Sequence, residues 1–426
     1  MKKIFTLILC AFMLIGFSAC AKTETAEKSG SVYWLNFKPE ADAALLDIAK
    51  TYKEETGVDV KVVTAASGGY NTALTSEMDK KNAPTLFVVG NMEALKTWGD
   101  YCYDLRGTEV FEKLNQDIIL YNEDGSVASI GYCYECFGII VNKDLLSKAG
   151  YSVEDIKDFN TLKAVADDIH ARRDALGFDA FTSAGLDSSS SWRFSGHLAN
   201  MPLFYEFRDK NITSQPEKIE GTYLYAYKNI WDLYNSSATI TGANLATATG
   251  DMASSEFKER KAVFFQNGSW EYQNLIDAGF TDEELCMIPI YTGVPGEENA
   301  GLCSGTENCW AVNKNASEED IKATLDFMNW LVTSDEGQKC MTEQFGAIPY
   351  ENAPENKNLF IKNAAEYAEE GKYSVSWDFS FTPGVEIWRM GVTDALTKYS
   401  AGFADWSEVE KAFVGGWERQ YREENR

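Results

Sequence analysis

Histidine is the scarcest residue of this chain, with two copies, His170 and His197, among 426 residues. A zinc site needs several His or Cys ligands. The short motif formed by Cys133, Tyr134, Glu135 and Cys136 therefore lacks the further ligands that would complete such a site. This scarcity argues against zinc enzymes and redox proteins, and we expect neither a metal nor a cofactor.

Positive charge is also in short supply, because 65 Asp and Glu residues oppose 39 Lys and Arg residues and give a net charge of -26. No run of basic residues interrupts this acidic chain. Nucleic acid and anionic membrane surfaces repel such a protein, so we expect no nucleic-acid partner.

Long apolar runs are missing too. The first one, residues 4–17, is shorter than the roughly 20 residues that a membrane-spanning helix needs.

The N-terminal segment has the pattern of an export signal instead. Lys2 and Lys3 precede the apolar run, and the small residues Ser18 and Ala19 stand directly before Cys20, which resembles a bacterial lipobox. We expect residues 1–19 to be a lipoprotein signal peptide, Cys20 to be lipidated and residues 20–31 to form a flexible tether. The protein would then be anchored at the extracytoplasmic face of the cytoplasmic membrane, in the cell envelope. An ordinary signal peptide with an incidental cysteine is the alternative.

Seven cysteines follow Cys20, and an odd number cannot pair completely within one chain. We expect buried thiols or occasional pairs rather than a redox centre. The seven are Cys102, Cys133, Cys136, Cys286, Cys303, Cys309 and Cys340.

Strand and helix patterns alternate along the chain. Residues 31–37 are rich in β-branched and aromatic side chains and predict a strand, and Leu45, Ile48 and Tyr52 follow at helical spacing. Residues 58–63 and 85–90 predict further strands. The same alternation resumes later, with a helix capped at Asn160 and Thr161 and another preceded by a capping box at Ser317. Alternation of this kind predicts an α/β fold with mostly parallel sheets, and the length of the chain predicts two lobes.

Ligands of open α/β sheets bind beyond the carboxyl ends of the strands. Amides, hydroxyls, carboxylates and aromatic rings recur just after the predicted strands, and this mixture suits the hydroxyls and flat C–H faces of a sugar. Core packing is the competing interpretation for any single aromatic residue. Arg193 is the one plausible anion clamp, and we expect it to be a structural ion-pair partner. The candidates after the strands are Asn36, Ser67, Asn91, Trp270 and Glu271.

Several longer segments resemble the extracellular solute-binding proteins of carbohydrate ABC transporters, the class that includes the maltose-binding type. They are VYWLNFKPE, YECFGIIVNKDLL, AVFFQNGSWEYQNL, GTENCWAVNKNASEEDIKATLDFMNWLVTSDEGQK and FGAIPY. The resemblance implies an α/β, two-lobed, periplasmic-binding-protein-like (Venus flytrap) fold with the ligand cleft between the lobes. It also implies how the chain divides, with lobe 1 formed by residues 32–138 and 308–352, and lobe 2, with the C-terminal helices, formed by residues 139–307 and 353–426.

The resemblance assigns roles to particular residues. Glu135 takes the place of a carboxylate that contacts sugar just before the chain first crosses from lobe 1 to lobe 2. Trp270 takes the place of a tryptophan that stacks on sugar. Asn36 falls in the polar turn after the first strand, where Phe37 and Lys38 replace the acidic residue often found nearby. Weaker candidates for the same site are Asn91, Trp192, Glu307, Trp377 and Trp388.

The function implied is capture of a sugar or oligosaccharide and its delivery to the membrane subunits of an ABC importer, by a monomer held through its lipid anchor. A polyamine or a peptide is the alternative cargo, because it would use the same acidic and aromatic residues. A glycan-acting enzyme is a further alternative, although the sequence shows no placed pair of carboxylates and no G-x-S-x-G motif. A purely adhesive surface protein is the last alternative, and it would show no closure of the lobes on a ligand.

Overall fold

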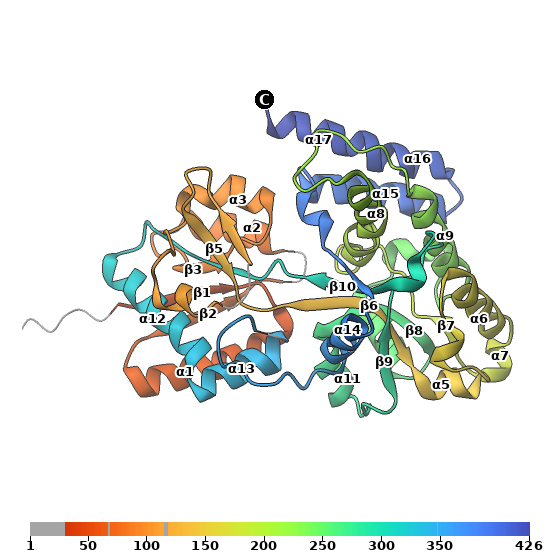
Figure 1. Ribbon diagram of the computed structural model, residues 1–426, viewed down its shortest axis with the longest axis horizontal. Coiled ribbons are helices and arrows are strands. Elements are labelled where there is room, and N and C mark those ends of the chain that lie inside the picture. The colour runs from red at the N-terminus through yellow and green to blue at the C-terminus, as the bar shows by residue number, and fades with distance from the viewer. Residues whose placement is uncertain (1–29, 67–68, 115–117, 347) are drawn as a thin grey trace, which may run out of the picture.

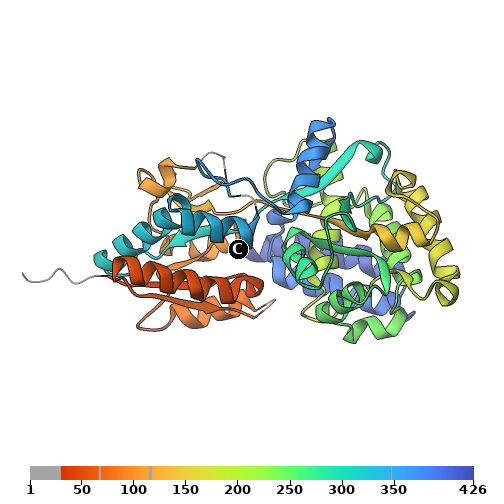
Figure 2. The same ribbon diagram turned by 90° about the horizontal axis from the view of Figure 1, so that it is seen from below.

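The computed structural model describes residues 30–66, 69–114, 118–346 and 348–426, and it has two lobes that lie side by side in both ribbon views (Figures 1 and 2). Each lobe is built around a six-stranded sheet with helices packed on it. The predicted α/β, two-lobed fold class is thereby confirmed. The expectation of mostly parallel sheets is wrong, because six of the ten strand pairings among the described residues are antiparallel. Cys20 and Ser67 lie outside the described residues.

Lobe 1 contains a sheet with the strand order β2-β1-β3-β11-β5-β4. The strand predicted at residues 31–37 is β1, which pairs in parallel with β2 and β3, whereas β11 runs antiparallel to β3 and β5. The strands are β1 (Val32–Asn36), β2 (Val60–Thr64), β3 (Leu86–Val88), β4 (Ile119–Tyr121), β5 (Val127–Gly131) and β11 (Cys309–Val312). The helices are α1 (Asp42–Thr56), α2 (Tyr70–Met78), α3 (Met92–Trp98), α4 (Glu109–Glu112), α12 (Glu318–Thr333) and α13 (Asp335–Phe345).

Large aromatic residues fill the core of lobe 1. The ring centroids of Trp34 and Trp310 are 6.0 Å apart in an edge-to-face arrangement, and Tyr132 stacks on Trp310 at 4.7 Å. All three side chains are fully buried. This packing joins the first strand of the chain to a strand that returns almost 280 residues later, so lobe 1 is assembled from two distant segments.

Lobe 2 contains a sheet with the order β12-β10-β6-β8-β7, and β9 pairs with the far half of β6. Its strands are β6 (Glu135–Asn142), β7 (Asp179–Phe181), β8 (Ala262–Gly268), β9 (Leu285–Ile288), β10 (Ala300–Gly305) and β12 (Tyr373–Val375). The first helices are α5 (Lys143–Lys148), α6 (Phe159–Ala171), α7 (Arg173–Leu176), α8 (Asn200–Lys210), α9 (Leu224–Ser236), α10 (Gly250–Lys258) and α11 (Tyr272–Asp277). The later ones are α14 (Leu359–Glu369), α15 (Val385–Ser400), α16 (Trp406–Glu410) and α17 (Gly416–Glu424).

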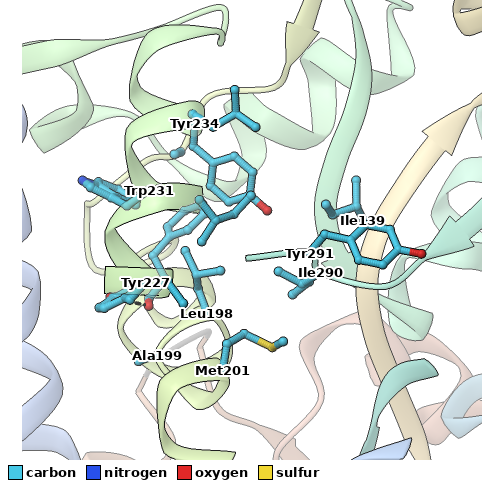
Figure 3. Packing of buried hydrophobic residues seen from close by; sticks show 14 of the residues in the cluster. Ile139, Leu198, Ala199, Met201, Tyr227, Trp231, Tyr234, Ile290 and Tyr291 are labelled. Carbon is cyan, nitrogen blue, oxygen red and sulfur yellow. Dashed lines mark hydrogen bonds between the residues drawn. The ribbon is translucent and has the colours of Figure 1, made fainter. Parts of the chain in front are cut away.

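The core of lobe 2 is again aromatic. Helix α9 places Tyr227, Trp231 and Tyr234 along one face, and all three are buried beside Leu198 and Met201 (Figure 3). Because 3.6 residues make one turn, the spacing of these three residues keeps them on the same side of the helix. The core therefore follows from the helical periodicity of the sequence.

Among the residues that the structure describes, the chain passes between the lobes at three places. Residues 132–134 connect β5 to β6, residues 306–308 connect β10 to β11, and residues 346–358 connect α13 to α14. The first two connections lie side by side, because Glu135 of β6 pairs with Gly305 of β10 in antiparallel register. This pair of crossings places several of the predicted site residues at the junction of the two lobes.

Two local predictions have different outcomes. The N-cap of the capping box predicted at Ser317 is confirmed at the start of α12, where the Ser317 hydroxyl accepts from the Asp320 N–H at 3.1 Å. The cap predicted at Asn160 and Thr161 is wrong. Helix α6 begins earlier, at Phe159, because Asp158 is the N-cap and Thr161 is the third helical residue of its capping box.

The seven cysteines 102–340 are free thiols in the structure, five of them buried and two half-buried. Burial raises the pKa of the Cys102 thiol to about 12, so this group stays protonated at neutral pH.

Within the described residues, no group of three His, Cys, Asp or Glu side chains is arranged to hold a metal ion. None of the helices in the same part of the chain combines the length and the apolarity that membrane crossing requires.

Candidate functional site

A polar cleft of about 540 Å³ opens between the lobes. Lobe 1 contributes the start of α1 and the end of α13, and lobe 2 contributes the turn after β8 together with α11. Four carboxylates line this cleft and no lysine or arginine is among its described lining residues. The carboxylates belong to Glu40, Glu135, Asp277 and Glu343, and Trp270 lines the cleft beside them.

Trp270 is held rigidly at the wall of this cleft. It lies in a single 3-10 turn, Ser269–Glu271, directly after β8. Its indole Nε1 donates to Asn267 Oδ1 at 2.8 Å, and a Cβ built on Gly268 would lie 2.2 Å from the ring. Only glycine at position 268 therefore lets the ring lie against the strand. Such a fixed, half-buried ring is suited to stacking on the flat face of a ligand.

Glu135 begins β6 and has both carboxylate oxygens engaged. Its Oε1 accepts from Lys38 Nζ at 2.6 Å and its Oε2 accepts from Asn308 Nδ2 at 2.7 Å. Burial acts to lower the pKa of Lys38, but the carboxylates of Glu135 and Glu40 outweigh it and raise that pKa above its ordinary value. Lys38 is therefore a buried ammonium at the junction of the lobes, 5.2 Å from the centroid of the Trp270 ring.

Asn36 organises the turn that delivers Lys38. The Asn36 amide donates to the Lys38 carbonyl at 2.6 Å and to Thr64 Oγ1 at 3.0 Å, and its Oδ1 accepts from the Lys38 N–H at 3.0 Å. The side chain is completely buried. The structure thus brings Asn36, Lys38, Glu135 and Trp270 together, and Lys38 is the member that the sequence analysis did not propose as a site residue.

An aromatic cluster continues from Trp270 into lobe 2. His197 is at its centre, with its ring 5.0 Å from Trp192, 5.4 Å from Trp270 and 5.7 Å from Trp377. Phe137 stacks on His197 at 4.1 Å with an interplanar angle of 3°. Three of the predicted tryptophans are therefore neighbours. His197 was missed, because a single histidine in a short π-helical stretch, Arg193–Leu198, gives no periodic signal in the sequence.

The environment of His197 gives a prediction about acid. Burial, together with the nearby Arg389 cation, lowers the pKa of His197 well below 6.5. Below pH 6.5 the unfolded chain therefore binds a proton at this histidine while the folded protein does not. We expect this difference to lower the free energy of unfolding by about 1.4 kcal/mol for each pH unit below about 6.5. The variant His197→Phe keeps an aromatic ring beside Phe137 and removes this loss. Urea unfolding at pH 7.5, 6.0 and 5.0 compares the two proteins, and equal pH slopes would contradict the prediction.

Asn91 and Glu307 meet on the lobe 1 side of the junction. Asn91 follows β3, where its Oδ1 caps α3 by accepting from the Ala94 N–H at 2.9 Å and its Nδ2 donates to Glu307 Oε1 at 2.8 Å. Burial raises the pKa of Glu307. Gly90 lets the two segments touch, because a Cβ there would be 1.7 Å from the Glu307 carbonyl oxygen.

Two further candidates, Glu271 and Trp388, differ in their distance from this region. The Glu271 carboxylate accepts from Asn267 Nδ2 at 3.1 Å, and burial raises its pKa. Trp388 is packed in the core of lobe 2, where its Nε1 donates to the Phe413 carbonyl at 2.8 Å, so it does not contribute to the cleft.

The interpretation of Arg193 as an ion-pair partner is wrong. No carboxylate oxygen of the described residues lies within 4.0 Å of its guanidinium, which instead donates to Ser190 Oγ at 2.6 Å and to two backbone carbonyls. Burial lowers the pKa of Arg193 to about 10. The residue therefore fastens the segment after Trp192 to the sheet of lobe 2.

Side chains on α3 join the lobes at a second place. Lys96 Nζ donates to Glu424 Oε2 at 2.7 Å and to Gln215 Oε1 at 2.9 Å, and both partners belong to lobe 2. The carboxylate of Glu93 accepts from the Val385 N–H at 2.7 Å, at the first residue of α15. A carboxylate from one lobe thus binds the N-terminus of a helix of the other, which the helix dipole favours. The lobes are in contact in this structure.

Comparison with known proteins now identifies the class. A family model of bacterial extracellular solute-binding proteins matches residues 47–368, and the chain belongs to this family. A search of curated proteins finds no match.

Solved structures with the same fold cover nearly the whole chain. The solute-binding protein RafE in complex with raffinose is 16% identical, with a TM-score of 0.71 over 92% of this chain and 99% of that one. The GacH receptor of Streptomyces glaucescens, solved unliganded and with acarbose, is 20% identical, with a TM-score of 0.70 over 93% and 99%. A sugar transporter of Bacillus licheniformis in complex with stachyose is 17% identical, with a TM-score of 0.68 over 92% and 100%. These similarities establish the two-lobed fold.

Proposed function

We propose that this protein captures a sugar or oligosaccharide between its lobes and delivers it to the membrane subunits of an ABC importer. The observation that carries the proposal is the fixed ring of Trp270 at the wall of a polar interlobe cleft, with further rings and amides beside it. The names of the structural neighbours support the class of ligand, since raffinose, acarbose and stachyose are all oligosaccharides.

The proposed mechanism is a hinged trap. A ligand that contacts both lobes stabilises only the closed form, so binding shifts the population toward closure. Trp192, Trp270 and Trp377 would stack on the ligand, and Asn91, Glu271 and Glu307 would bind hydroxyl groups, with Ser67 as a further candidate. Asn36 and Glu135 would act together with the Lys38 ammonium that they hold.

The proposal extends to the whole exported protein. Residues 1–19 would be removed, Cys20 would carry the lipid, and a monomer would remain tethered through residues 20–31 at the extracytoplasmic face of the membrane. The lobe boundaries inferred from the resemblance belong to the same proposal. Ligand release without chemical change is expected, and analysis of the recovered sugar by mass spectrometry tests this.

A cationic cargo is the second candidate, because four carboxylates line the cleft and the Lys38 ammonium pairs with two of them, Glu135 and Glu40. A polyamine would bind such a surface through charge and through the face of Trp270. Sugars, polyamines and short peptides should therefore be screened together by thermal shift, since a ligand that binds only the folded state raises the melting temperature.

The variant Trp270→Ala tests the proposed site. We expect it to weaken binding of the sugar found in the screen by about 1–3 kcal/mol, because an aromatic platform of fixed orientation is lost. Isothermal titration calorimetry measures this change.

Trp330→Ala is the matched control, since Trp330 is also half-buried but lies on α12 of lobe 1, away from the cleft. If both variants bind as the unmodified protein does, Trp270 is not the platform. If only polyamines raise the melting temperature in the screen, the cargo is a cation and the sugar proposal is wrong.

A further inference from the structure

Arg389 has a donor that the protein itself does not use. The residue lies in the first turns of α15 on lobe 2, and its side chain is 24% exposed. One terminal nitrogen donates to Glu386 Oε1 at 3.2 Å. The Nε–H is buried and has no hydrogen-bond partner within the described structure. An unpaired buried donor of this kind is costly, so a partner from a ligand would be rewarded.

The position of Arg389 places this donor at the aromatic cluster. A Cβ built on Gly196 would lie 3.7 Å from Arg389 Nε, so the guanidinium rests on the backbone between Trp192 and His197. The same cation contributes to the lowered pKa of His197. Arg389 is therefore next to the rings that are proposed to stack on the ligand, although no pattern in the sequence marked it.

Glu307 faces the same region from the other side. Only its Oε1 has a hydrogen bond within the described residues, from Asn91. Asn91 is the N-cap of α3, and the start of α3 is joined to the start of α15, which holds Arg389, by the hydrogen bond from the Val385 N–H to the Glu93 carboxylate at 2.7 Å. In agreement with this proximity, burial raises the pKa of Glu307 and the Arg389 cation opposes that increase. No Arg389 nitrogen lies within 4.0 Å of a Glu307 oxygen, however, so the two groups are neighbours without being an ion pair.

We propose that Arg389 and Glu307 together recognise two neighbouring hydroxyl groups of the bound sugar. One hydroxyl oxygen accepts from the Arg389 Nε–H, and the adjacent hydroxyl donates to the Glu307 carboxylate. This inference rests on the proposed function and adds to it the residues that determine specificity. A hydroxyl pair offers both an acceptor and a donor, as this arrangement requires. Because Arg389 belongs to lobe 2 and Glu307 is held by Asn91 of lobe 1, the same contact favours closure.

The charge around the pair specifies a neutral ligand group. Glu386 already bonds to Arg389, and Glu307 and Glu93 add negative charge nearby. A carboxylate or phosphate would meet these groups with repulsion, whereas a hydroxyl pair leaves the charge balance unchanged. The site is therefore expected to bind an uncharged sugar more tightly than a uronic acid or a sugar phosphate.

The experiment is a double-mutant cycle on the full mature protein with raffinose, stachyose, maltotriose and chitotriose as probes. Each of Arg389→Met and Glu307→Gln is expected to weaken binding of the recognised sugar about tenfold or more. The double variant is expected to lose clearly less than the product of the two single losses, because both residues hold one hydroxyl pair. Calorimetry gives the affinities.

Arg422→Met is the matched control, since Arg422 forms a similar ion pair within a helix, with Glu418 on α17, but is 59% exposed. Melting temperatures without sugar show whether a variant is merely unfolded. If Arg389→Met binds the sugar as tightly as the control does, the inference is overturned while the proposed function stands. If none of the four probes binds the unmodified protein, both the inference and its underlying function are rejected. If the affinity loss of the double variant equals the product of the two single losses, the two residues do not share one hydroxyl pair, and the inference is also overturned.

Discussion

Replacing Lys38 by methionine is expected to lower the free energy of unfolding by about 3–5 kcal/mol, because it leaves a buried carboxylate without its cation. The Lys38 and Glu135 side chains are only 8% and 4% exposed, and their charged atoms are 2.6 Å apart. The amide of Asn308 remains on Glu135, but a neutral donor does not compensate for the lost ammonium. Urea unfolding at pH 7.5 measures the change.

The same variant should be sensitive to pH in a defined direction. Burial raises the pKa of Glu135, and Lys38 opposes that increase. Without Lys38 the folded protein holds a proton on Glu135 more tightly than the unfolded chain does. This stabilisation is complete below the ordinary pKa of a glutamate, about 4.3, and is lost as the pH rises through the folded value. The loss in free energy of unfolding caused by Lys38→Met should therefore become smaller as the pH falls.

Two comparisons separate this effect from a general loss of charge. Lys398→Met removes an exposed pair with Asp394 on α15, whose side chains are 54% and 65% exposed, and should leave stability nearly unchanged because solvent screens the pair. The double variant Lys38→Met with Glu135→Gln should recover part of the loss, because no uncompensated charge remains. If the two single lysine variants behave alike at every pH, the buried pair is not important for stability.

Lys38 also illustrates how far the sequence could lead. The alternation of strands and helices predicted both α/β lobes, and the spacing of apolar residues predicted α1, whose buried residues include Leu45, Ile48 and Tyr52. The pairing of Lys38 with Glu135 could not be predicted in this way. These residues are 97 positions apart, and only the packing of one lobe on the other brings them together.

The aromatic residues show a similar limit. Sequence reasoning selected tryptophans by type and by their place after strands, but it could not tell which face of each ring is covered. Trp377 lies in the cluster around His197, whereas Trp388 is enclosed by the C-terminal helices. Arg389, one residue further along, points to the cluster because neighbouring helical positions face different directions.

Gly90→Ala should destabilise the protein by about 3 kcal/mol, since the added methyl group would overlap the backbone of the second crossing. A Cβ at this position would be 1.7 Å from the Glu307 carbonyl oxygen and 2.5 Å from its carbon. The crossing cannot move away freely, because β11 is paired with β3 directly beside it, with Trp310 opposite Val88. A lower melting temperature in thermal unfolding is the expected result.

Gly391→Ala is the control that isolates this steric cause. Gly391 lies inside α15, and a Cβ there would meet no atom within 4 Å. Alanine favours a helix over glycine by up to about 1 kcal/mol, so this variant should melt at a higher temperature. The two substitutions are chemically identical and should change stability in opposite directions. If both raise the melting temperature, the crossing tolerates the methyl group, and its close contact with Gly90 does not fix the positions of Asn91 and Glu307.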